Sequence, residues 1–212
     1  MGEVSTPATV WLSTAYLAPI HYYAKLAAAE HVFVEQHDHY VKQSYRNRCL
    51  IAAPQGVQAL TVPVVCPEAD TLMRDVRISD HGNWRHLHWN ALITAYNHTP
   101  FFEYYRDDFA PFYERKYRYL MDFNDELCRL VCSLMDLHPH VQRTDAYRAD
   151  LPPAADFRER IHPKRSCSAD DPAFVSRPYY QVFEAKHGFL PNLSIVDLLF
   201  NMGTESQLYL ER

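Results

Sequence analysis

The sequence predicts an α/β fold: a central, mostly parallel sheet with a β-hairpin, covered by a helical C-terminal half. Three observations carry this prediction. A strand, helix, strand order occupies residues 9–35, two β-prone runs flank a Pro-Gln-Gly turn, and helical patterns dominate from residue 84 onward. With 212 residues, 48% of them hydrophobic, the chain can bury one sizeable core, so we expect a single domain over residues 1–212.

The first two predicted strands form a parallel pair. Residues 9–13 and 31–35 are short apolar runs, and residues 19–29 between them show a helical pattern whose first turn holds a proline. A strand, helix, strand order of this length is typical of a right-handed crossover. The turn at residues 13–23 then lies at the ligand-binding edge of the sheet. We interpret His21 as an ordinary histidine with satisfied hydrogen bonds, because the glycine spacing of a nucleotidyl-transferase loop is absent.

A β-hairpin is predicted next. Residues 48–53 and 57–65 are β-prone runs. Pro54-Gln55-Gly56 joins them, with proline supplying a fixed φ and glycine the left-handed conformation of a hairpin turn. Residues 76–79 are predicted as a further strand.

Two long helical patterns follow. The first covers residues 84–97, and the second runs throughout residues 101–137, with Asn124 as a predicted N-cap. Residues 148–178 are rich in Pro, Asp, Arg and Ser and contain few apolar residues. They predict a long irregular segment, for which two interpretations stay open: a lid over a site, or a disordered surface insert.

The last predicted helix is capped by Ser194 and ended by Gly203, with Asp197 placed to bond back to the cap. By itself this pattern indicates only a capped apolar helix that packs into the core. A second interpretation, in which Asn192, Asp197 and Asn201 hold the loops of a site by hydrogen bonds, stays open.

Composition excludes some classes of function. The net charge of −5 and the pI near 6.2 argue against a dedicated nucleic-acid or membrane-surface binder. No apolar run approaches the roughly 20 residues of a membrane span and no leader pattern is present, so we expect a cytoplasmic protein.

The five cysteines lack CxxC spacing, so neither disulfides nor a metal site is expected, and we interpret Cys128 and Cys132 as half-buried core thiols. The 15 tyrosines and 11 phenylalanines are expected mainly to pack the core.

Two segments hold the candidate site residues. After the second strand, Asn47 and Arg48 are the best candidates, because a guanidinium binds carboxylate or phosphate in a bidentate manner. In the helix that begins near residue 84, His88 and Tyr96 share one face and Trp84 lies in the first turn. Imidazole titrates near physiological pH, so His88 is a candidate general base; the alternative is a helical histidine bonded to a backbone carbonyl.

Several motifs carry a family resemblance. They are Lys42, Tyr45-Arg46-Asn47-Arg48, Leu60-Thr61-Val62-Pro63-Val64, Trp84-Arg85-His86-Leu87-His88, Ala95-Tyr96, Pro100-Phe101-Phe102 and residues 191–203. With these motifs the chain resembles the WbqC-like family, found in bacterial gene clusters for O-antigen and other surface polysaccharides. The resemblance covers Leu12 to about Leu210. Two departures are Thr14-Ala15-Tyr16, where many members have Gln-Pro-Tyr, and Gln36-His37, which replaces an Asp-Asp pair.

The resemblance implies a transferase that moves glycine or a related acyl group onto an amino sugar. In that chemistry His88 would be the general base, and Asn47 with Arg48 would stabilise the tetrahedral oxyanion. The partner would be a small molecule, either an activated acyl donor or a sugar nucleotide, and no cofactor is assigned. The residues expected to bind substrate are Lys42, Tyr16, Trp84 and Tyr96.

Two rival functions stay open. One is nucleotidyl or adenylate-forming transfer, with the donor bound after the first strand. The other is a non-catalytic module that binds a partner of the glycan machinery through a tyrosine-rich surface. The second rival predicts an exposed aromatic patch and no enclosed polar pocket.

Overall fold

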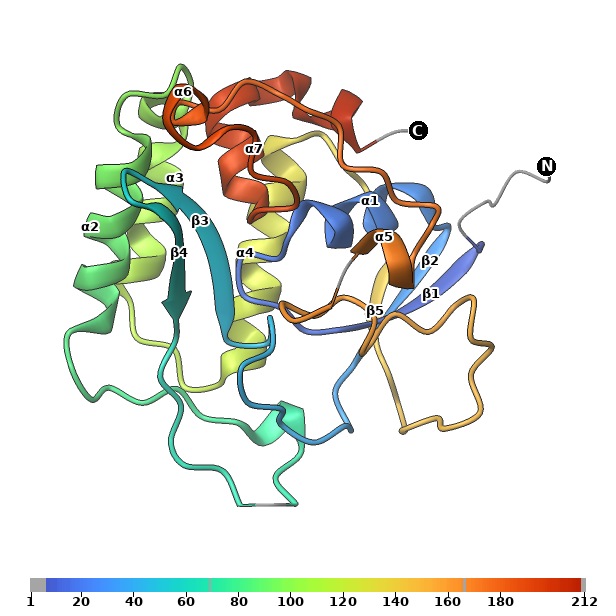
Figure 1. Ribbon diagram of the computed structural model, residues 1–212. Helices are drawn as coiled ribbons and strands as arrows, with labels where there is room; N and C mark the ends of the chain where they lie inside the picture. Colours follow the sequence, from blue (N-terminus) through green and yellow to red (C-terminus); the bar gives the residue numbers. More distant parts are fainter. Residues whose placement is uncertain (1–6, 69, 166, 211–212) are drawn as a thin grey trace.

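The chain folds into a mixed α/β structure in which a parallel sheet and a β-hairpin are joined and covered by helices (Figure 1). This confirms the predicted fold class. The computed structural model describes residues 7–68, 70–165 and 167–210.

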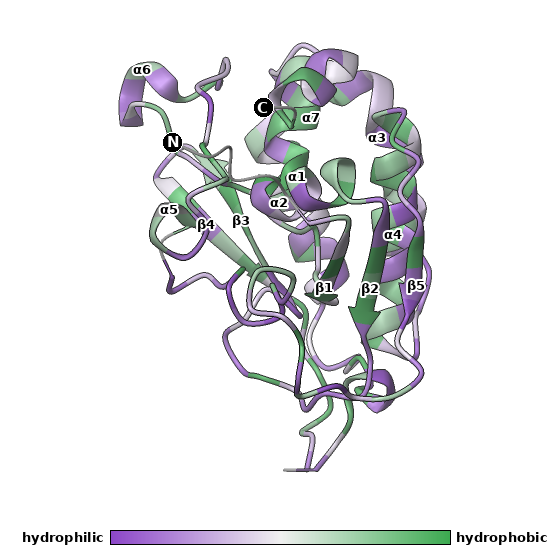
Figure 2. Ribbon diagram, turned by 90° about the vertical axis from the view of Figure 1, so that its right-hand side faces the viewer, coloured by the Kyte–Doolittle hydropathy of each residue, from purple (hydrophilic) through white to green (hydrophobic). Residues whose placement is uncertain are grey.

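The parallel sheet has the strand order β1-β2-β5, with β1 spanning Thr9–Ser13, β2 His31–Glu35 and β5 Val141–Arg143. Helix α1 (Ile20–Ala28) connects the first two strands, so the predicted crossover is confirmed. Val10 pairs with Val32 and Leu12 with Val34, and these four buried side chains lie on the same face of the two strands. This face of the sheet therefore packs into the core. Figure 2 shows β1 and β2 as largely hydrophobic.

The hairpin consists of β3 (Arg48–Ala53) and β4 (Gly56–Thr61), joined by a two-residue turn. Gly56 has φ +115°, the left-handed conformation that the sequence predicted for it. The predicted second strand was too long at its end, because β4 stops at Thr61. The predicted strand at 76–79 is wrong: this segment makes only single bridges, at Arg77 and Ile78.

The predicted helix over residues 101–137 is two helices, α3 (Phe102–Glu114) and α4 (Leu120–Leu134). The break has a tertiary cause. Ile78 N–H donates to Arg118 O and Leu120 N–H donates to Val76 O, so an extended backbone pairing replaces the helical one between the two helices. Helix α2 (Trp84–Tyr96) matches its prediction closely. No helix in the described part of the chain is long and apolar enough to cross a membrane.

The predicted N-cap role of Asn124 is wrong as well. Asn124 lies inside α4, and its buried side chain points away from the helix end to donate hydrogen bonds to other segments. Polar residues of this kind cap helices only when they precede the first turn. Tyr119 occupies the cap position instead.

Described parts of the irregular segment 148–178 pack along the sheet. Asp156 forms a parallel bridge with Trp11 of β1, and Phe157, Ile161 and Phe174 are buried. The described part of the segment includes the short helix α5 (Cys167–Asp170). Its aromatic and β-branched residues Phe157, Ile161 and Phe174 reach the core, whereas Val175 is exposed.

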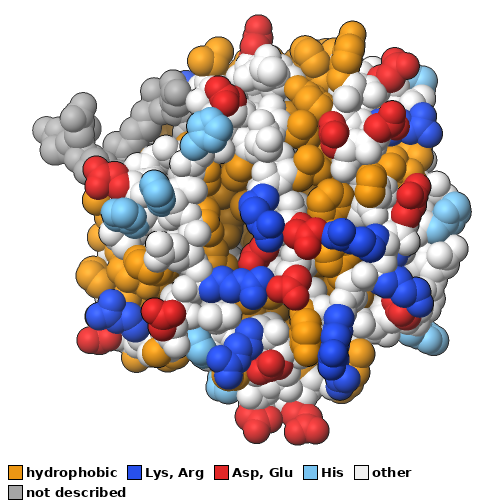
Figure 3. Space-filling view, turned by 180° about the vertical axis from the view of Figure 1, so that it is seen from behind, with side chains coloured by type: hydrophobic (Ala, Val, Ile, Leu, Met, Phe, Trp, Pro, Cys, Tyr) orange, Lys and Arg blue, Asp and Glu red, His pale blue; other side chains and the backbone are white. Residues whose placement is uncertain are grey.

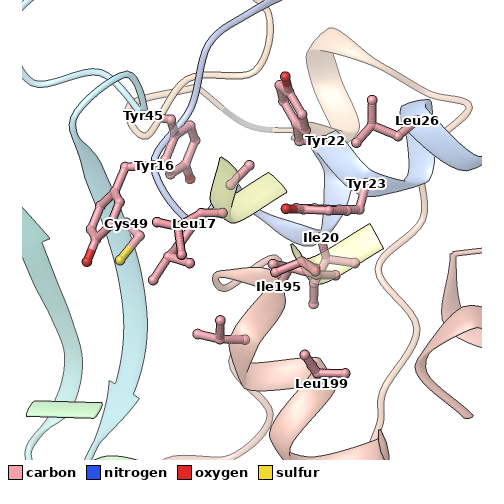
Figure 4. Packing of buried hydrophobic residues seen from close by; sticks show 14 of the residues in the cluster. Tyr16, Leu17, Ile20, Tyr22, Tyr23, Leu26, Tyr45, Cys49, Ile195 and Leu199 are labelled. Carbon is pink, nitrogen blue, oxygen red and sulfur yellow. The ribbon is translucent and has the colours of Figure 1, made fainter. Parts of the chain in front are cut away.

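The C-terminal part supplies the centre of the core. It comprises α6 (Glu184–His187), α7 (Ile195–Met202) and the 3₁₀ helix η2 (Gly203–Tyr209). Another short 3₁₀ helix, η1 (Met73–Asp75), lies earlier in the chain. Figure 4 shows Ile195 and Leu199 of α7 packed close to Leu17 and Ile20. Gly203 ends α7 with φ +60°, as predicted.

The expected cap of α7 is only partly right. Ser194 occupies the N-cap position, but its hydroxyl donates to Leu17 O, 2.7 Å away, and makes no capping bond. Asp197 accepts hydrogen bonds from Tyr96 and Tyr179 and not from the cap. These long-range bonds fix α7 against two other segments.

Candidate functional site

The structure brings three predicted site residues together at the end of β4. Arg48 Nε donates to Thr61 Oγ1 at 3.0 Å, and Asn47 Nδ2 donates to Val62 O at 2.8 Å. The His88 ring also forms a hydrogen bond with the backbone of Thr61. His88, Asn47 and Arg48 therefore all contact the same stretch of chain, Thr61-Val62.

His88 lies in an aromatic environment. Its Nδ1 is 3.0 Å from the Tyr16 hydroxyl oxygen, which is 2.9 Å from that of Tyr113. The ring of Trp84 meets the imidazole edge-on at 5.1 Å. Burial lowers the pKa of His88 to about 4, partly opposed by the bond to the Thr61 backbone. The imidazole is consequently neutral at physiological pH, and its catalytic role stays a prediction.

The other predicted binding residues differ in exposure. Tyr16 and Tyr96 are fully buried, and Trp84 is buried with its indole N–H donating to Ser79 O at 3.1 Å. The Tyr96 hydroxyl donates to Asp197 Oδ1 at 2.9 Å. Lys42 is exposed on the loop between β2 and β3. Substrate binding by these four residues stays a prediction, and the structure shows that three of them also hold the core together.

A second polar group lies at the carboxyl edge of the parallel sheet, where the second strand ends. Glu35, at the end of β2, is fully buried and accepts a bond from Thr144 Oγ1 at 2.7 Å and from Arg158 at 3.2 Å. Backbone N–H of His37 donates to the same carboxylate at 2.8 Å. A buried carboxylate needs such donors, because its desolvation is costly.

Arg46 and Asn124 extend this polar edge. Arg46 is buried and forms ion pairs with Asp38 at 2.5 Å and Glu159 at 2.8 Å. Asn124 Nδ2 donates to Arg46 O at 2.8 Å and to Thr14 Oγ1 at 3.1 Å. Three buried polar atoms here have no hydrogen-bond partner within the described part of the protein: Arg46 Nε, Asp38 Oδ1 and Asn124 Oδ1. Buried polar atoms without partners are rare in proteins and mark places where a ligand or water can bind.

A cleft of about 410 Å³ opens at the same edge. It lies between α4 and the ends of β1, β2 and β5, and Figure 3 shows a hollow with a hydrophobic floor on this side of the molecule. We call it the sheet-edge cleft. The residues that line it are Thr14, Ala15, Tyr22, Val34, Asn124, Asp125, Cys128, Arg129, Cys132, Ser133, Leu137, His138, Pro139, Val141 and Arg143.

Charged side chains stand at the rim of the sheet-edge cleft, beside its hydrophobic floor (Figure 3). Arg143 is held by Asp122 at 2.7 Å and Asp125 at 2.6 Å. Arg129 is exposed and forms no ion pair with any described residue. Arg129 is thus a guanidinium available to an anionic group of a ligand.

The turn after β1 does not offer a free helix N-terminus. Ile20 N–H donates to Leu193 O, and His21 N–H donates to Asn192 Oδ1 at 2.9 Å. The His21 ring is buried and bonded to Asp171 at 2.7 Å, so the interpretation of an ordinary satisfied histidine is confirmed. Since the first N–H groups of α1 are occupied by the segment before α7, an anion has no access to them.

No three His, Cys, Asp or Glu side chains are grouped for metal binding over residues 7–68, 70–165 and 167–210. Seven of the 15 tyrosines are buried, and four more, Tyr40, Tyr105, Tyr117 and Tyr209, pack against the core from partly buried positions, so packing is the main use of these rings, as predicted. The signal for Arg46 was present in the sequence, since it stands beside Asn47 within one motif. Nothing local distinguishes Asn124 from a helix cap.

Comparison with known proteins gives the family. The model of the WbqC-like protein family matches residues 14–162, about 70% of the chain. The chain belongs to the WbqC-like protein family. The matched range begins at Thr14 and contains both polar groups described above, so the sheet-edge cleft lies within the part of the chain that defines WbqC-like proteins.

A curated relative has similar length. The uncharacterized protein Rv1507c of Mycobacterium tuberculosis is 28% identical over 214 residues, which cover 89% of this chain and 91% of that protein. No solved structure was found to match this WbqC-like chain.

Proposed function

We propose that this protein is an acyl- or aminoacyl-transferase of bacterial surface-polysaccharide synthesis, and that its amino-sugar substrate binds in the sheet-edge cleft. The cleft itself is the observation that carries the proposal. Its 410 Å³ fall in the roughly 300–1000 Å³ range of small-molecule sites, and its lining includes Thr14, Ala15 and Arg143 at the carboxyl ends of β1 and β5. Membership of the WbqC-like family supports the substrate class.

The cleft wall suits a sugar that carries a phosphate. Tyr22, Val34 and Val141 offer apolar surface to the faces of a sugar ring. Arg129 at the rim offers a guanidinium that no described carboxylate occupies. A guanidinium binds phosphate through two parallel N–H bonds, so a sugar nucleotide fits better than a neutral sugar.

One buried polar atom of the cleft wall, Asn124 Oδ1, suits an amine. Asn124 is 1% exposed and lines the cleft, and its Oδ1 has no partner among the described residues. An amide oxygen accepts hydrogen bonds, and a sugar amine donates them. A hydroxyl would also satisfy this atom, but an amine brings its nucleophilic nitrogen to a fixed place beside α4.

The group around Thr61 is the second part of the proposal. His88 is kept neutral by burial, with its Nδ1 3.0 Å from the Tyr16 hydroxyl oxygen, and Asn47 and Arg48 lie beside the same turn. None of these three residues lines the sheet-edge cleft, and the connection is indirect: Tyr16, which contacts His88, follows the cleft residue Ala15. Within this proposal His88 keeps the general-base role.

Thermal unfolding with sugar nucleotides tests the binding step. A uridine-diphosphate amino sugar with a free amine should raise the melting temperature, because a ligand that binds only the folded state stabilises it. The same sugar with an acetylated amine should stabilise less. Equal stabilisation by both would remove the amine from the proposal, and no stabilisation by any sugar nucleotide would overturn it.

A matched pair of arginine variants locates the site. Arg129→Ala should weaken sugar-nucleotide binding by roughly tenfold or more, as expected for loss of a charged hydrogen bond. Arg106→Ala is the control, since Arg106 is an exposed arginine on α3 that does not line the cleft. Calorimetry that gives both variants the same affinity would place the ligand elsewhere.

A further inference from the structure

Helix α4 presents one continuous ridge to the sheet-edge cleft. Asn124, Cys128 and Cys132 are spaced four residues apart on this helix, which aligns their side chains, and all three line the cleft. Cys128 is half-buried, and Cys132 is buried. A thiol therefore faces the cleft one helical turn from the unpartnered amide oxygen of Asn124.

The Cys128 sulfur lies against two polar groups. Contacts with the Cys132 thiol and the Tyr23 hydroxyl lower the pKa of Cys128 below its ordinary value, while burial opposes them. Asp125 opposes the shift and Arg129 supports it. Cys49, which is fully buried in the core, shows the opposite behaviour, because burial raises the pKa of its thiol. The Cys128 thiol, which lines the cleft, therefore ionises more readily than the buried Cys49 thiol.

We infer that Cys128 is the nucleophile that carries the acyl group as a thioester between donor and sugar amine. This inference rests on the proposed acyl transfer and names the residue that performs its first step. Tyr23 and Cys132 act as positioning residues, because they reach the acyl group only through the Cys128 sulfur. The cleft geometry supports the order of events, since donor and acceptor would meet the same ridge of α4.

The two steps balance. The Cys128 thiolate attacks the carbonyl carbon of an activated acyl ester or thioester; a C–S bond forms, the bond to the donor alcohol or thiol breaks, and that leaving group takes up the proton the Cys128 thiol had released. The sugar amine then attacks the thioester carbonyl. A C–N bond forms, the C–S bond breaks, the thiolate is regenerated, and the amine loses one proton to a base or to water.

Acetylation by p-nitrophenyl acetate tests the first step on the intact protein. We expect one hydroxylamine-labile acetyl group, located on Cys128 by peptide mass mapping of the wild type. Cys128→Ser should lose it, while Cys66→Ser, which changes an exposed cysteine outside the cleft, should keep it. Acetylation that occurs only at other residues, or equally in Cys128→Ser, would overturn the inference. The mapping on wild type needs no variant to fold.

Alkylation by iodoacetamide tests whether Tyr23 and Cys132 influence the ionisation of Cys128. Tyr23→Phe and Cys132→Ala should each move the pH midpoint of Cys128 alkylation upward, and should slow its rate at pH 7 by roughly three- to tenfold, because the thiolate fraction falls tenfold per pKa unit. Cys66 in the same samples serves as the internal reference. Unchanged midpoints in both variants would show that these two residues do not activate Cys128 and would overturn the assignment.

The two proposals fail in different ways. If sugar nucleotides stabilise the protein and Cys128→Ser still forms the acylated sugar at the wild-type rate, the thioester is wrong and the transfer stands. If Cys128 is acetylated but no sugar nucleotide binds, the nucleophile stands and the amino-sugar acceptor is wrong.

Discussion

The side-chain amide of Asn124 donates a hydrogen bond to the backbone carbonyl of Arg46 across 2.8 Å. The two residues are 78 positions apart in the chain. The same amide nitrogen reaches Thr14 Oγ1, so one buried side chain joins α4 to the ends of β1 and the loop before β3. This pairing fixes the wall of the sheet-edge cleft.

Asn124→Ala should therefore destabilise the fold. The substitution removes two hydrogen bonds and leaves the Arg46 carbonyl buried without its donor, which costs about 1–3 kcal/mol. Asn90→Ala is the matched control, because Asn90 is exposed on α2 and bonds only to the exposed His86. Urea unfolding measures both. A loss no larger than that of Asn90→Ala would mean that the Asn124 bonds contribute little.

The low pKa of His88 predicts that the protein becomes less stable as the pH is lowered. The unfolded chain takes up a proton near pH 6.5, whereas buried His88 stays neutral down to about pH 4, so the unfolded state binds more protons between these values. From pH 7 to pH 5 this linkage should lower the free energy of unfolding by about 2 kcal/mol. His88→Gln should lack that part of the loss, while His21 remains in both proteins. Identical pH dependence in the two proteins would contradict the assignment.

Activity gives an independent test of His88. His88→Ala should abolish product formation in a reconstituted transfer assay if the imidazole takes the amine proton. His86→Ala is the control, since His86 lies on the same helix but is exposed. The melting temperature of each variant separates loss of fold from loss of chemistry. Normal turnover by folded His88→Ala would remove His88 from the mechanism.

Asp171 should anchor the segment 148–178. Its buried carboxylate bonds to His21 at 2.7 Å and forms an ion pair with Lys25, and these partners hold its pKa well below the usual range. Asp171→Asn removes a buried negative charge that contacts both His21 and Lys25, and the loss of these charged hydrogen bonds should cost about 1.5–3 kcal/mol. The neighbouring Asp170→Asn changes a more exposed carboxylate and should cost little.

Limited proteolysis tests the same prediction within residues 148–178 themselves. Trypsin should cut within residues 148–178 sooner in Asp171→Asn than in the wild type or Asp170→Asn, because the buried anchor to α1 is lost. Equal cleavage rates in all three proteins would mean that the aromatic contacts alone hold the segment. Those contacts are real, since the ring of Phe174 stacks on His21 at 4.4 Å.

Local sequence determined the elements that depend on neighbours in the chain. The bounds of β1, β2 and β3 agree with their predictions, because alternating or continuous apolar runs between turn residues need no distant partner to be recognised. Gly56 and Gly203 were recognised for the same reason, since positive φ is a property of the single residue. The motif at residues 45–48 likewise drew attention to the right stretch of chain, although its most buried charge, Arg46, was passed over.

Tertiary structure decided everything that depends on distant partners. The helical pattern of residues 101–137 breaks because Val76 and Ile78 pair with the backbone near Arg118, and no local signal reports such a pairing. The sheet-edge cleft exists because Thr14, Arg46 and Asn124 meet at one end of the sheet, although more than 100 residues separate the first from the last. The sequence by itself determined strands, helices, turns and family; only packing decided which polar side chains lost contact with water, and burial is what turns such side chains into a site.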